Sequence, residues 1–242
     1  GKSRRLWKQQ LPKMFTQTRG QSSPGYGPSG LNDSQHRDGR NARKVVEWID
    51  KKSYGDKPFF ITVGIHKPHV PFIAPQKYFD LYPRRELQFE LSPANDWADI
   101  PKMAMVKRFS GFGFELGREN DPLRREYTQA YHACVSFVDA QIGLILDKLK
   151  AQELWEDTIV IFTSDHGYHL GEHEFWQKSS LHEESARIPL IIAAPGNGPA
   201  VSSSLAQMID LYPTLAEMCG LALPDHLQGL AVQGVFHRRG AF

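Results

Sequence analysis

Residues 163–178 bring together the side chains in this sequence that could do chemistry. Asp165 and His166 come three and four residues after the end of an unbroken β-branched and aromatic run, residues 158–162. Such a run is typical of a strand buried on both faces of a parallel sheet. Ligands bind at the carboxyl ends of such strands, so a carboxylate beside an imidazole there suggests a metal site. An Asp-Gly-type turn that merely ends a strand is an equally good interpretation of these residues alone.

The same loop carries further histidines and a lysine. His166, His169 and His173 suggest zinc, but their spacing is not HExxH, and glycines at 167 and 171 argue against one helix presenting all three. Lys178 follows shortly after, next to an aromatic residue, where a cation could bind an anionic group. A lone lysine is more often a solvated surface charge, and that alternative stays open.

A second predicted strand, residues 57–64, also ends in polar residues. His69 lies between Pro68 and Pro71, and the two prolines restrict the backbone and hence the direction of the imidazole. Rigidity of this kind suits a general acid or an anion ligand, whereas a structural loop histidine is the plainer alternative. Because strands of one parallel sheet end at the same edge, His69 is expected near Asp165.

Helical patterns separate the predicted strands. Apolar residues recur at three- and four-residue spacing over 38–52 and 122–152, which predicts two amphipathic helices. Residues 187–194 predict a strand nearer the sheet's edge, and residues 210–219 predict a helix that ends at Gly220. The alternation predicts an α/β fold with a parallel sheet.

Composition is that of a globular protein. The chain has 242 residues, of which 40% are hydrophobic and 23% charged, which argues against wholesale disorder. A formal net charge of +2 is too small to imply a nucleic-acid partner, and nothing approaches the roughly 18 apolar residues of a membrane span. Residues 1–32 are basic and rich in Gly, Pro and Ser, which predicts a loop or tail. Cys134 and Cys219 are expected to be buried small hydrophobic residues.

Several segments of this sequence resemble a known protein family, which suggests roles that residue spacing alone does not. The stretch from Thr163 to His173, followed by Trp176 and Lys178, resembles the second metal-site region of the type I sulfatases, in the alkaline-phosphatase superfamily. Within that family it is similar to the iduronate-2-sulfatase branch. Independent likeness comes from Lys57-Pro58-Phe59-Phe60, His66 to Phe72, Ala74 to Phe79, Glu184 to Leu190 and Asp210 to Thr214. It extends over roughly residues 40–230.

The resemblance implies an alkaline-phosphatase-like α/β fold, with a mostly parallel sheet and helices on both faces. It implies hydrolysis of sulfate monoesters on sulfated sugars or glycosaminoglycan-type glycans, with a divalent cation, usually calcium. By position, Asp165 and His166 are the metal ligands. His69 hydrogen-bonds the sulfate and protonates the leaving oxygen, and Lys178 neutralises sulfate charge in the transition state. An imidazole is an unusual ligand for calcium, so chemistry alone leaves the ion's identity open.

Parts of the family pattern have no counterpart in this sequence. The family nucleophile is a formylglycine, an aldehyde made from Cys or Ser in Cys/Ser-x-Pro-x-Arg, and neither cysteine has that context. The nearest approach begins at Ser22, but Tyr26 stands in place of the arginine. The acidic metal ligands of the first strand and the smaller C-terminal subdomain are also without a match. Without a nucleophile, the isolated chain is expected to have little or no activity.

The resulting interpretation is a partial sulfatase α/β domain over residues 33–230. It follows the basic loop of residues 1–32 and precedes an atypical tail, residues 231–242, with the N-terminal first-strand region and the C-terminal subdomain missing. A non-catalytic remnant or glycan-binding protein, and a phosphoester hydrolase of the same superfamily, are the alternatives. The expected partner is a sulfated carbohydrate. By kinship the protein is expected to be exported (periplasmic, extracellular or lysosomal), although no signal peptide opens this sequence.

Overall fold

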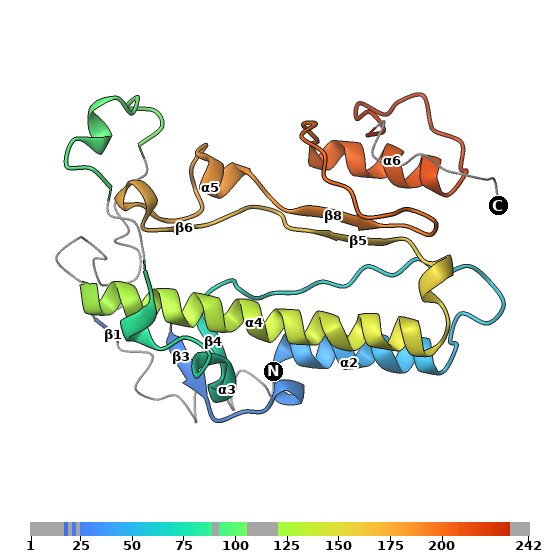
Figure 1. Cartoon of the computed structure of the whole chain (residues 1–242), viewed down its shortest axis with the longest axis horizontal. Helices are drawn as coiled ribbons and strands as arrows, with labels where there is room; N and C mark the ends of the chain where they lie inside the picture. Colours follow the sequence, from blue (N-terminus) through green and yellow to red (C-terminus); the bar gives the residue numbers. More distant parts are fainter. Residues whose placement is uncertain (1–16, 19–20, 23–24, 89–91, 106–120, 233–242) are drawn as a thin grey trace. The chain divides into compact units, whose positions relative to one another are not determined.

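The structure is a computed structural model that describes residues 17–18, 21–22, 25–88, 92–105 and 121–232 (Figure 1). The chain forms two compact units, each described here by itself. The first comprises residues 1–155 and 162–191, and the second comprises residues 156–161 and 192–242. All the side chains singled out above as candidate site residues belong to the first unit.

A long helix, α4 (Asp121–Ala151), is the scaffold of the first unit. Helix α2 (Arg37–Asp50) packs along it, as Figure 1 shows. Lys148 of α4 donates to Asp50 of α2 at 2.7 Å, and Arg43 donates to the buried Gln141 at 2.9 Å. These helices confirm the two amphipathic patterns predicted over 38–52 and 122–152, because each apolar stripe found a partner to cover it.

The core of the first unit lies between α4 and a short buried strand, β4 (Phe72–Pro75), whose residues are all buried. Helix α3 (Gln76–Phe79) follows β4 directly. The core residues come from β4, α3, α4 and the loop after residue 165: Phe72, Ala74, Tyr78, Phe79, Tyr127, Ala130, Ala133, Cys134, Phe137, Val138 and Trp176.

Strand β3 (Tyr26–Ser29) pairs in parallel with β4, with Tyr26 opposite Phe72. The prediction that residues 1–32 form a loop is therefore wrong for its last part. Short strands β1 (Gln17–Thr18) and β2 (Gln21–Ser22) also pair, antiparallel. Strand β3 was not predicted because its residues are typical of turns. Pairing with the buried strand β4 decides strand formation here more than local propensity does.

Residues 57–64 do not form the predicted strand. The segment has no ladder partner among the described residues, and the Phe60 side chain is 77% exposed. An apolar β-branched run forms a strand only where a neighbouring strand takes up its backbone hydrogen bonds.

The other two predicted strands are present. Strand β5 (Val160–Thr163) pairs with β8 (Leu190–Ala193). Their apolar side chains are not fully covered, since Phe162 is 40% and Ile191 61% exposed. The described strands form four two-stranded sheets, so the expected single parallel sheet with helices on both faces is not present within the described residues. The architecture they do form is mixed α/β.

The second unit contains helix α6 (Leu211–Met218), which confirms the helix predicted over 210–219. Asp210 accepts from the backbone N–H of Leu230 at 2.9 Å, and the Thr214 hydroxyl accepts from that of Val232 at 2.9 Å. Gly220 ends the helix with φ 68°, a conformation that suits glycine. Residues 233–242, most of the predicted tail, lie outside the described residues.

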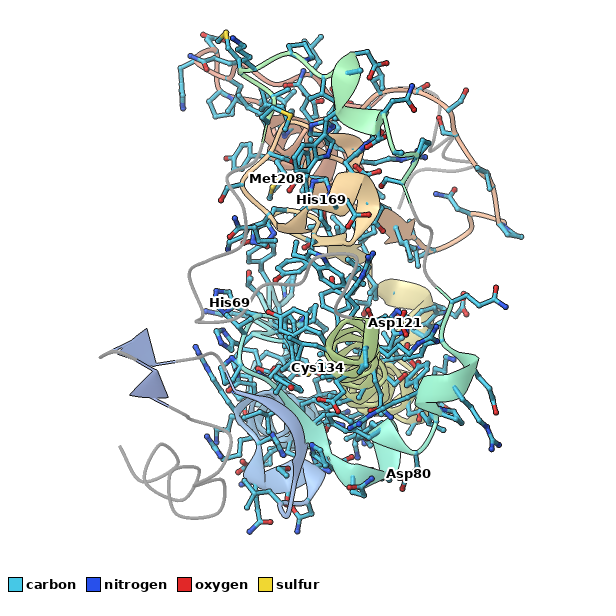
Figure 2. The ribbon with its side chains drawn as sticks, turned by 90° about the vertical axis from the view of Figure 1, so that its left-hand side faces the viewer. His69, Asp80, Asp121, Cys134, His169 and Met208 are labelled. Atoms are coloured by element: carbon cyan, nitrogen blue, oxygen red, sulfur yellow. The ribbon has the colours of Figure 1, made fainter. Side chains whose placement is uncertain are left out.

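The two cysteines differ in their environments. Cys134 is buried among the side chains around α4, as predicted (Figure 2), whereas Cys219 is exposed, contrary to the prediction. Cys219 is the C-cap of α6, where the chain leaves the helix, and this accounts for its exposure. Among the described residues, no helix combines the length and apolar character needed to cross a bilayer.

His36, at the start of α2, gives a pH prediction. Its ring is 1% exposed, lies 5.1 Å from that of Phe137 and has Nε2 2.8 Å from Oγ of Ser29. Burial lowers the pKa of His36 from 6.5 to about 4. The unfolded imidazole therefore binds a proton between these pH values while the folded one does not. The contribution of His36 to stability is complete above pH 6.5, and about 3 kcal/mol is lost as the pH falls to 4.

Urea unfolding at pH 7.5, 6, 5 and 4.5 measures this effect. The free energy of unfolding of the His36→Gln variant should fall less steeply over that window than that of the unmodified chain. Exposed His226 provides the matched control, since His226→Gln should leave the profile unchanged. Parallel profiles for the His36→Gln variant and the unmodified chain would contradict the assignment.

Candidate functional site

A small hairpin folds the chemically active loop back on itself. Strand β6 (His169–Leu170) pairs antiparallel with β7 (Trp176–Gln177), with His169 opposite Gln177. The hairpin returns Lys178 to the start of the loop, where its Nζ lies 2.7 Å from Nε2 of His166. Two residues twelve positions apart in the sequence, both predicted to bear chemistry, are therefore in direct contact.

The hairpin is anchored on α4 by Trp176. This side chain is 2% exposed, and its ring packs edge-on against Tyr127 at 5.9 Å. The guanidinium of Arg124, itself fully buried, lies 5.5 Å from the indole ring. At the turn, Gly171 has φ 121°, and a Cβ there would lie 3.2 Å from the indole. Glycine is thus needed both for the backbone angle and for the close approach.

The hydrogen bonds of His166 define its tautomer. Nδ1 lies 2.7 Å from the carbonyl oxygen of Gly167, so Nδ1 carries the proton and donates it. Nε2 is then the acceptor for the Lys178 ammonium. Oδ2 of Asp165 lies 3.5 Å from the same Nε2, and the Asp165 side chain is 81% exposed. A carboxylate oxygen, an imidazole lone pair and an ammonium therefore converge on one point.

This donor set fits part of the coordination shell of a divalent cation. Oδ2 of Asp165 and Nε2 of His166 are close enough to bind one ion together. Two ligands are fewer than the six to eight that calcium takes. Lys178 shares the His166 nitrogen with any such ion, so its ammonium would have to release that nitrogen and would then be free to contact an anion.

Ser185 ties together the two ends of the loop, a role that the sequence did not indicate. Ser185 lies in helix α5 (Glu183–Ala186) and is 5% exposed. Its carbonyl accepts from the Gly167 backbone N–H at 2.8 Å, and its hydroxyl donates to the Lys178 carbonyl at 2.8 Å. Ser185 lies within the family-like segment Glu184 to Leu190, but its type indicates no role, because a small serine in a short helix is common without such a function.

Gly167 allows a close approach of helix α5. A Cβ at this position would lie 2.1 Å from the carbonyl oxygen of Glu184. The missing side chain lets α5 approach the backbone beside His166, and this contact brings Ser185 into hydrogen-bonding range.

His69 lies in a different loop and is exposed (Figure 2). Its Nδ1 lies 2.7 Å from the carbonyl of Val70, and its ring stacks on that of His66 at 4.8 Å. The Nδ1 proton is donated to that carbonyl, so Nε2 is the ring atom left for a ligand. Prolines 68 and 71 are not the only constraint on this loop.

Asp38 and Lys67 hold the His69 loop from inside the protein. Asp38, 2% exposed in α2, accepts from the backbone N–H groups of His66 at 2.9 Å and Lys67 at 2.8 Å. The ammonium of Lys67, 6% exposed, donates to the carbonyl of His69 at 3.1 Å and also to that of Pro71. Burial lowers the pKa of Lys67. Neither residue was predicted from the sequence, because an aspartate in a polar helix start and a lysine inside a histidine-rich motif are both typical of surface charges.

The structure thus brings together Asp165, His166 and Lys178. Among the described residues, no hydrogen bond or ion pair joins His69 to these three, so their common use of one ligand stays a prediction. His169 is fully buried with Nε2 2.7 Å from Oγ of Ser180, and burial lowers its pKa to about 4. That environment indicates a neutral, structural imidazole.

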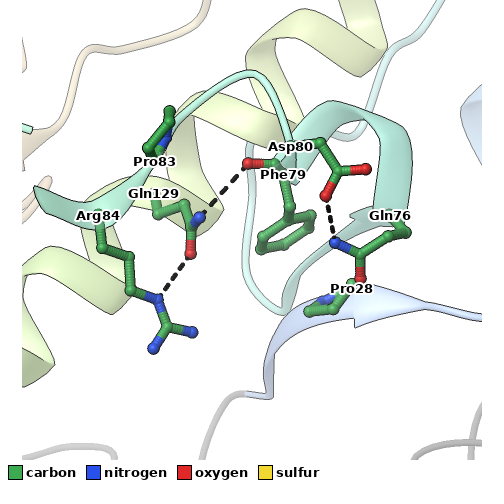
Figure 3. A pocket seen from close by; sticks show the side chains of 7 residues that line it. All are labelled: Pro28, Gln76, Phe79, Asp80, Pro83, Arg84 and Gln129. Carbon is green, nitrogen blue, oxygen red and sulfur yellow. Dashed lines mark hydrogen bonds between the residues drawn. The ribbon is translucent and has the colours of Figure 1, made fainter. Parts of the chain in front are cut away.

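A hollow of about 450 Å³ lies elsewhere in the first unit, between β3, α3 and α4 (Figure 3). Its polar side chains are engaged with one another. Gln129 accepts from Arg84 at 2.9 Å and donates to the Phe79 carbonyl at 3.3 Å, while Gln76 donates to Asp80 at 2.6 Å. None of the predicted site residues lines it, and its polar groups are already used, so we assign it no ligand.

Comparison with known proteins gives one consistent result. The model of the family described as "Sulfatase" matches residues 7–221. A sulfatase of Formosa agariphila is 37% identical over 186 residues, which cover 74% of this chain and 36% of the relative. Human iduronate 2-sulfatase is 30% identical over 223 residues, covering 77% of this chain and 40% of the enzyme. The chain therefore spans well under half the length of these relatives.

The crystal structure of the phosphonate monoester hydrolase of Agrobacterium radiobacter superposes with a TM-score of 0.72 at 23% identity. The match covers 95% of this chain and 49% of that protein. At this identity the likeness establishes the fold alone, which is the alkaline-phosphatase-like fold shared by sulfatases and phosphonate hydrolases.

The close contact at Gly167 predicts the effect of a single methyl group. Gly167→Ala should lower the free energy of unfolding by about 1–3 kcal/mol, because the added carbon forces α5 away from the strand end. Gly64→Ala is the matched control, since a Cβ at position 64 meets nothing within 4 Å. Urea unfolding of the two variants measures the difference, and equal stabilities would contradict the described packing of α5.

Proposed function

Since the chain belongs to the sulfatase family, we propose that it carries one part of the active site of a sulfuric ester hydrolase that acts on sulfated sugars. The observation that carries the proposal is the 2.7 Å contact between Nζ of Lys178 and Nε2 of His166. It sets an ammonium group beside the carboxylate–imidazole pair that the family resemblance assigns to the metal. An anionic oxygen bound at this point would meet positive charge from the ammonium group and from the metal ion that the pair would hold.

The proposed roles follow from the free atoms of each side chain. Lys178 has three N–H donors, of which one reaches His166, and the others are available to sulfate oxygens. His69 is exposed and retains Nε2, so in its protonated form it can hydrogen-bond the ester oxygen and donate a proton to it as the bond to sulfur breaks. General-acid help of this kind contributes roughly 10²–10⁴ in rate.

Asp165 and His166 are proposed as two ligands of a divalent cation, which in this family is usually calcium. When bound, the ion supplies positive charge against the sulfate oxygens. The family typically uses a divalent metal, and the exposed carboxylate of Asp165 is the kind of oxygen ligand that calcium prefers. His166 keeps the Nε2 lone pair in position because its Nδ1 proton is held by the Gly167 carbonyl.

The family's nucleophile motif, Cys/Ser-x-Pro-x-Arg, does not occur in this sequence. The nearest Ser-x-Pro approach ends at Tyr26, whose hydroxyl donates to Glu126 at 2.8 Å in the structure. Tyr26 is thus engaged within the fold and does not supply the guanidinium of the family motif. We propose that the isolated chain binds sulfate esters but hydrolyses them little or not at all, and that the remaining active-site residues lie outside this sequence.

The proposed substrate class is a sulfated carbohydrate of the glycosaminoglycan type. The likeness to iduronate 2-sulfatase, an enzyme named for a sulfated sugar acid, supports this class. An exported location, expected for this branch, belongs to the same proposal. A non-catalytic glycan-binding remnant and a phosphoester hydrolase are the competing functions.

Calorimetric titration of this chain with a sulfated disaccharide, in the presence of calcium, tests the proposal. Lys178→Ala should weaken binding about tenfold or more, because a charge-assisted hydrogen bond contributes about 1.5–3 kcal/mol. Exposed Lys57 is the matched control, and Lys57→Ala should leave the affinity unchanged.

The competing functions give different results in the same experiment. Preference for the corresponding phosphate ester over the sulfate ester would favour the phosphoester hydrolase. Affinity that does not depend on Lys178, Asp165 or calcium would contradict the proposed site. Assays of hydrolysis on the isolated chain should show little or no turnover, and sustained turnover would contradict the absence of the nucleophile.

A further inference from the structure

We propose that His173, His182 and Glu184 form a second metal site, distinct from Asp165 and His166, that binds zinc. His173 lies in a single helical turn (Glu172–Glu174), His182 is the N-cap of α5, and Glu184 lies in the first turn of that helix. Each offers one ligand atom, and these three atoms lie within 4.8 Å of one another. The proposal is independent of the function proposed above.

Both histidines are held by hydrogen bonds on one ring nitrogen. Nδ1 of His173 lies 2.9 Å from Oδ2 of Asp96, and Nε2 of His182 lies 3.0 Å from the carbonyl of Ala104. An imidazole that donates one N–H to a carboxylate or carbonyl keeps the other nitrogen as a lone pair, correctly oriented for a metal. This second layer of hydrogen bonds is what metal-binding histidines usually have.

The carboxylate of Glu184 is only partly satisfied by the protein. Its Oε2 is buried and has no hydrogen-bond partner among the described residues. Nδ1 of His169 lies 3.9 Å away, and it is also buried and without a hydrogen bond among those residues. A buried acceptor without a donor is costly, and a cation bound between the carboxylate and the two imidazoles would remove that cost.

The backbone at this place is also unusual. His173 has φ 54° and Glu174 has φ 58°, a left-handed conformation that non-glycine residues rarely adopt. The indole of Trp97 donates to the His173 carbonyl at 2.7 Å and holds the residue in that conformation. The strain keeps the His173 ring near His182, with 4.9 Å between the ring centroids.

The ligand types select the ion. Two imidazoles and one carboxylate are the donors of three-ligand zinc sites, with a fourth position for water. Calcium and magnesium prefer oxygen ligands only. Zinc–nitrogen distances of 2.0–2.1 Å place tetrahedral ligand atoms about 3.4 Å apart. The ligand atoms, now up to 4.8 Å apart, therefore need to close by up to about 1.4 Å, which rotamer adjustment can supply.

The bound ion would connect two separate segments of the chain. Asp96, Trp97 and Ala104, all within residues 92–105, contact the histidines, and the ligands themselves lie within residues 173–184. The second segment also contains Lys178. A zinc ion here would therefore act as a structural clamp that limits the movement of the loop bearing that ammonium.

Titration of the purified chain with zinc chloride, followed by calorimetry, tests the proposal. One equivalent should bind, and His182→Ala should weaken that binding by at least tenfold. Asp96→Asn, which changes only a hydrogen-bond partner, should weaken it 10- to 100-fold. Replacement of zinc by cobalt(II) should give the visible absorption of a four-coordinate ion, and this absorption should be lost in the His182→Ala variant.

Two controls separate this site from other histidines and from the Asp165 site. His226→Ala removes an exposed histidine of the other unit and should leave zinc binding unchanged. Asp165→Asn should also leave it unchanged. Circular dichroism establishes that each variant is folded, and Glu184→Gln replaces His182→Ala if the latter does not fold. Equal affinity in the His182→Ala or Glu184→Gln variant and the unmodified chain, or loss of affinity in Asp165→Asn, would overturn the proposal.

Discussion

Burial of Trp176 against α4 is the interaction on which the candidate site depends. An indole that packs between Tyr127 and the guanidinium of Arg124 gives about 3–5 kcal/mol, judged by the usual cost of truncating a core tryptophan. Lys178 is two residues away, and its contact with His166 exists only while the hairpin is held down. The reactive side chains themselves are partly exposed and supply little of this stability. Core packing therefore positions the reactive side chains, and these side chains contribute little to the stability of the core.

The His69 loop is held by the same principle through different chemistry. Here the anchor is polar, since buried Asp38 accepts two backbone N–H groups and the ammonium of Lys67 donates to two carbonyls. Such a network is strong only when all its members are present, because a buried charge without partners is costly. Both anchors end on the helix pair α2 and α4. Two loops that are far apart in the sequence thus share one rigid support.

The sequence predicted well what depends on local periodicity. Helices α2, α4 and α6 were predicted within a few residues. The apolar stripes of α2 and α4 have a clear period and pack against each other, and Gly220 marks the end of α6. Strand pairing was predicted poorly. Residues 57–64 look like a strand and have no ladder partner among the described residues, while Tyr26–Ser29 look like a turn and pair with β4. Pairing depends on distant neighbours, which periodicity does not report.

The candidate site shows the same division. Asp165, His166 and Lys178 were predicted from a motif, and the structure places them in contact. Ser185 and Lys67 lie within segments that resemble the family, but no role was predicted for them or for Asp38, because their roles come from hydrogen bonds made across the fold. The His182–Glu184 pair was missed for a related reason. In the sequence, His166, His169 and His173 were the candidate zinc ligands. In the fold, His173 lies instead beside His182 and Glu184.

Lys178 and His69 are proposed to bind one small tetrahedral anion beside Asp165 and His166. A crystal structure of this chain with calcium and sulfate would show whether they do. We expect one sulfate whose oxygens lie within about 3.2 Å of both Nζ of Lys178 and Nε2 of His69, next to an ion bound by Asp165 and His166. A sulfate held by Lys178 with the His69 ring beyond the reach of a bridging water, or turned away from it, would contradict the claim.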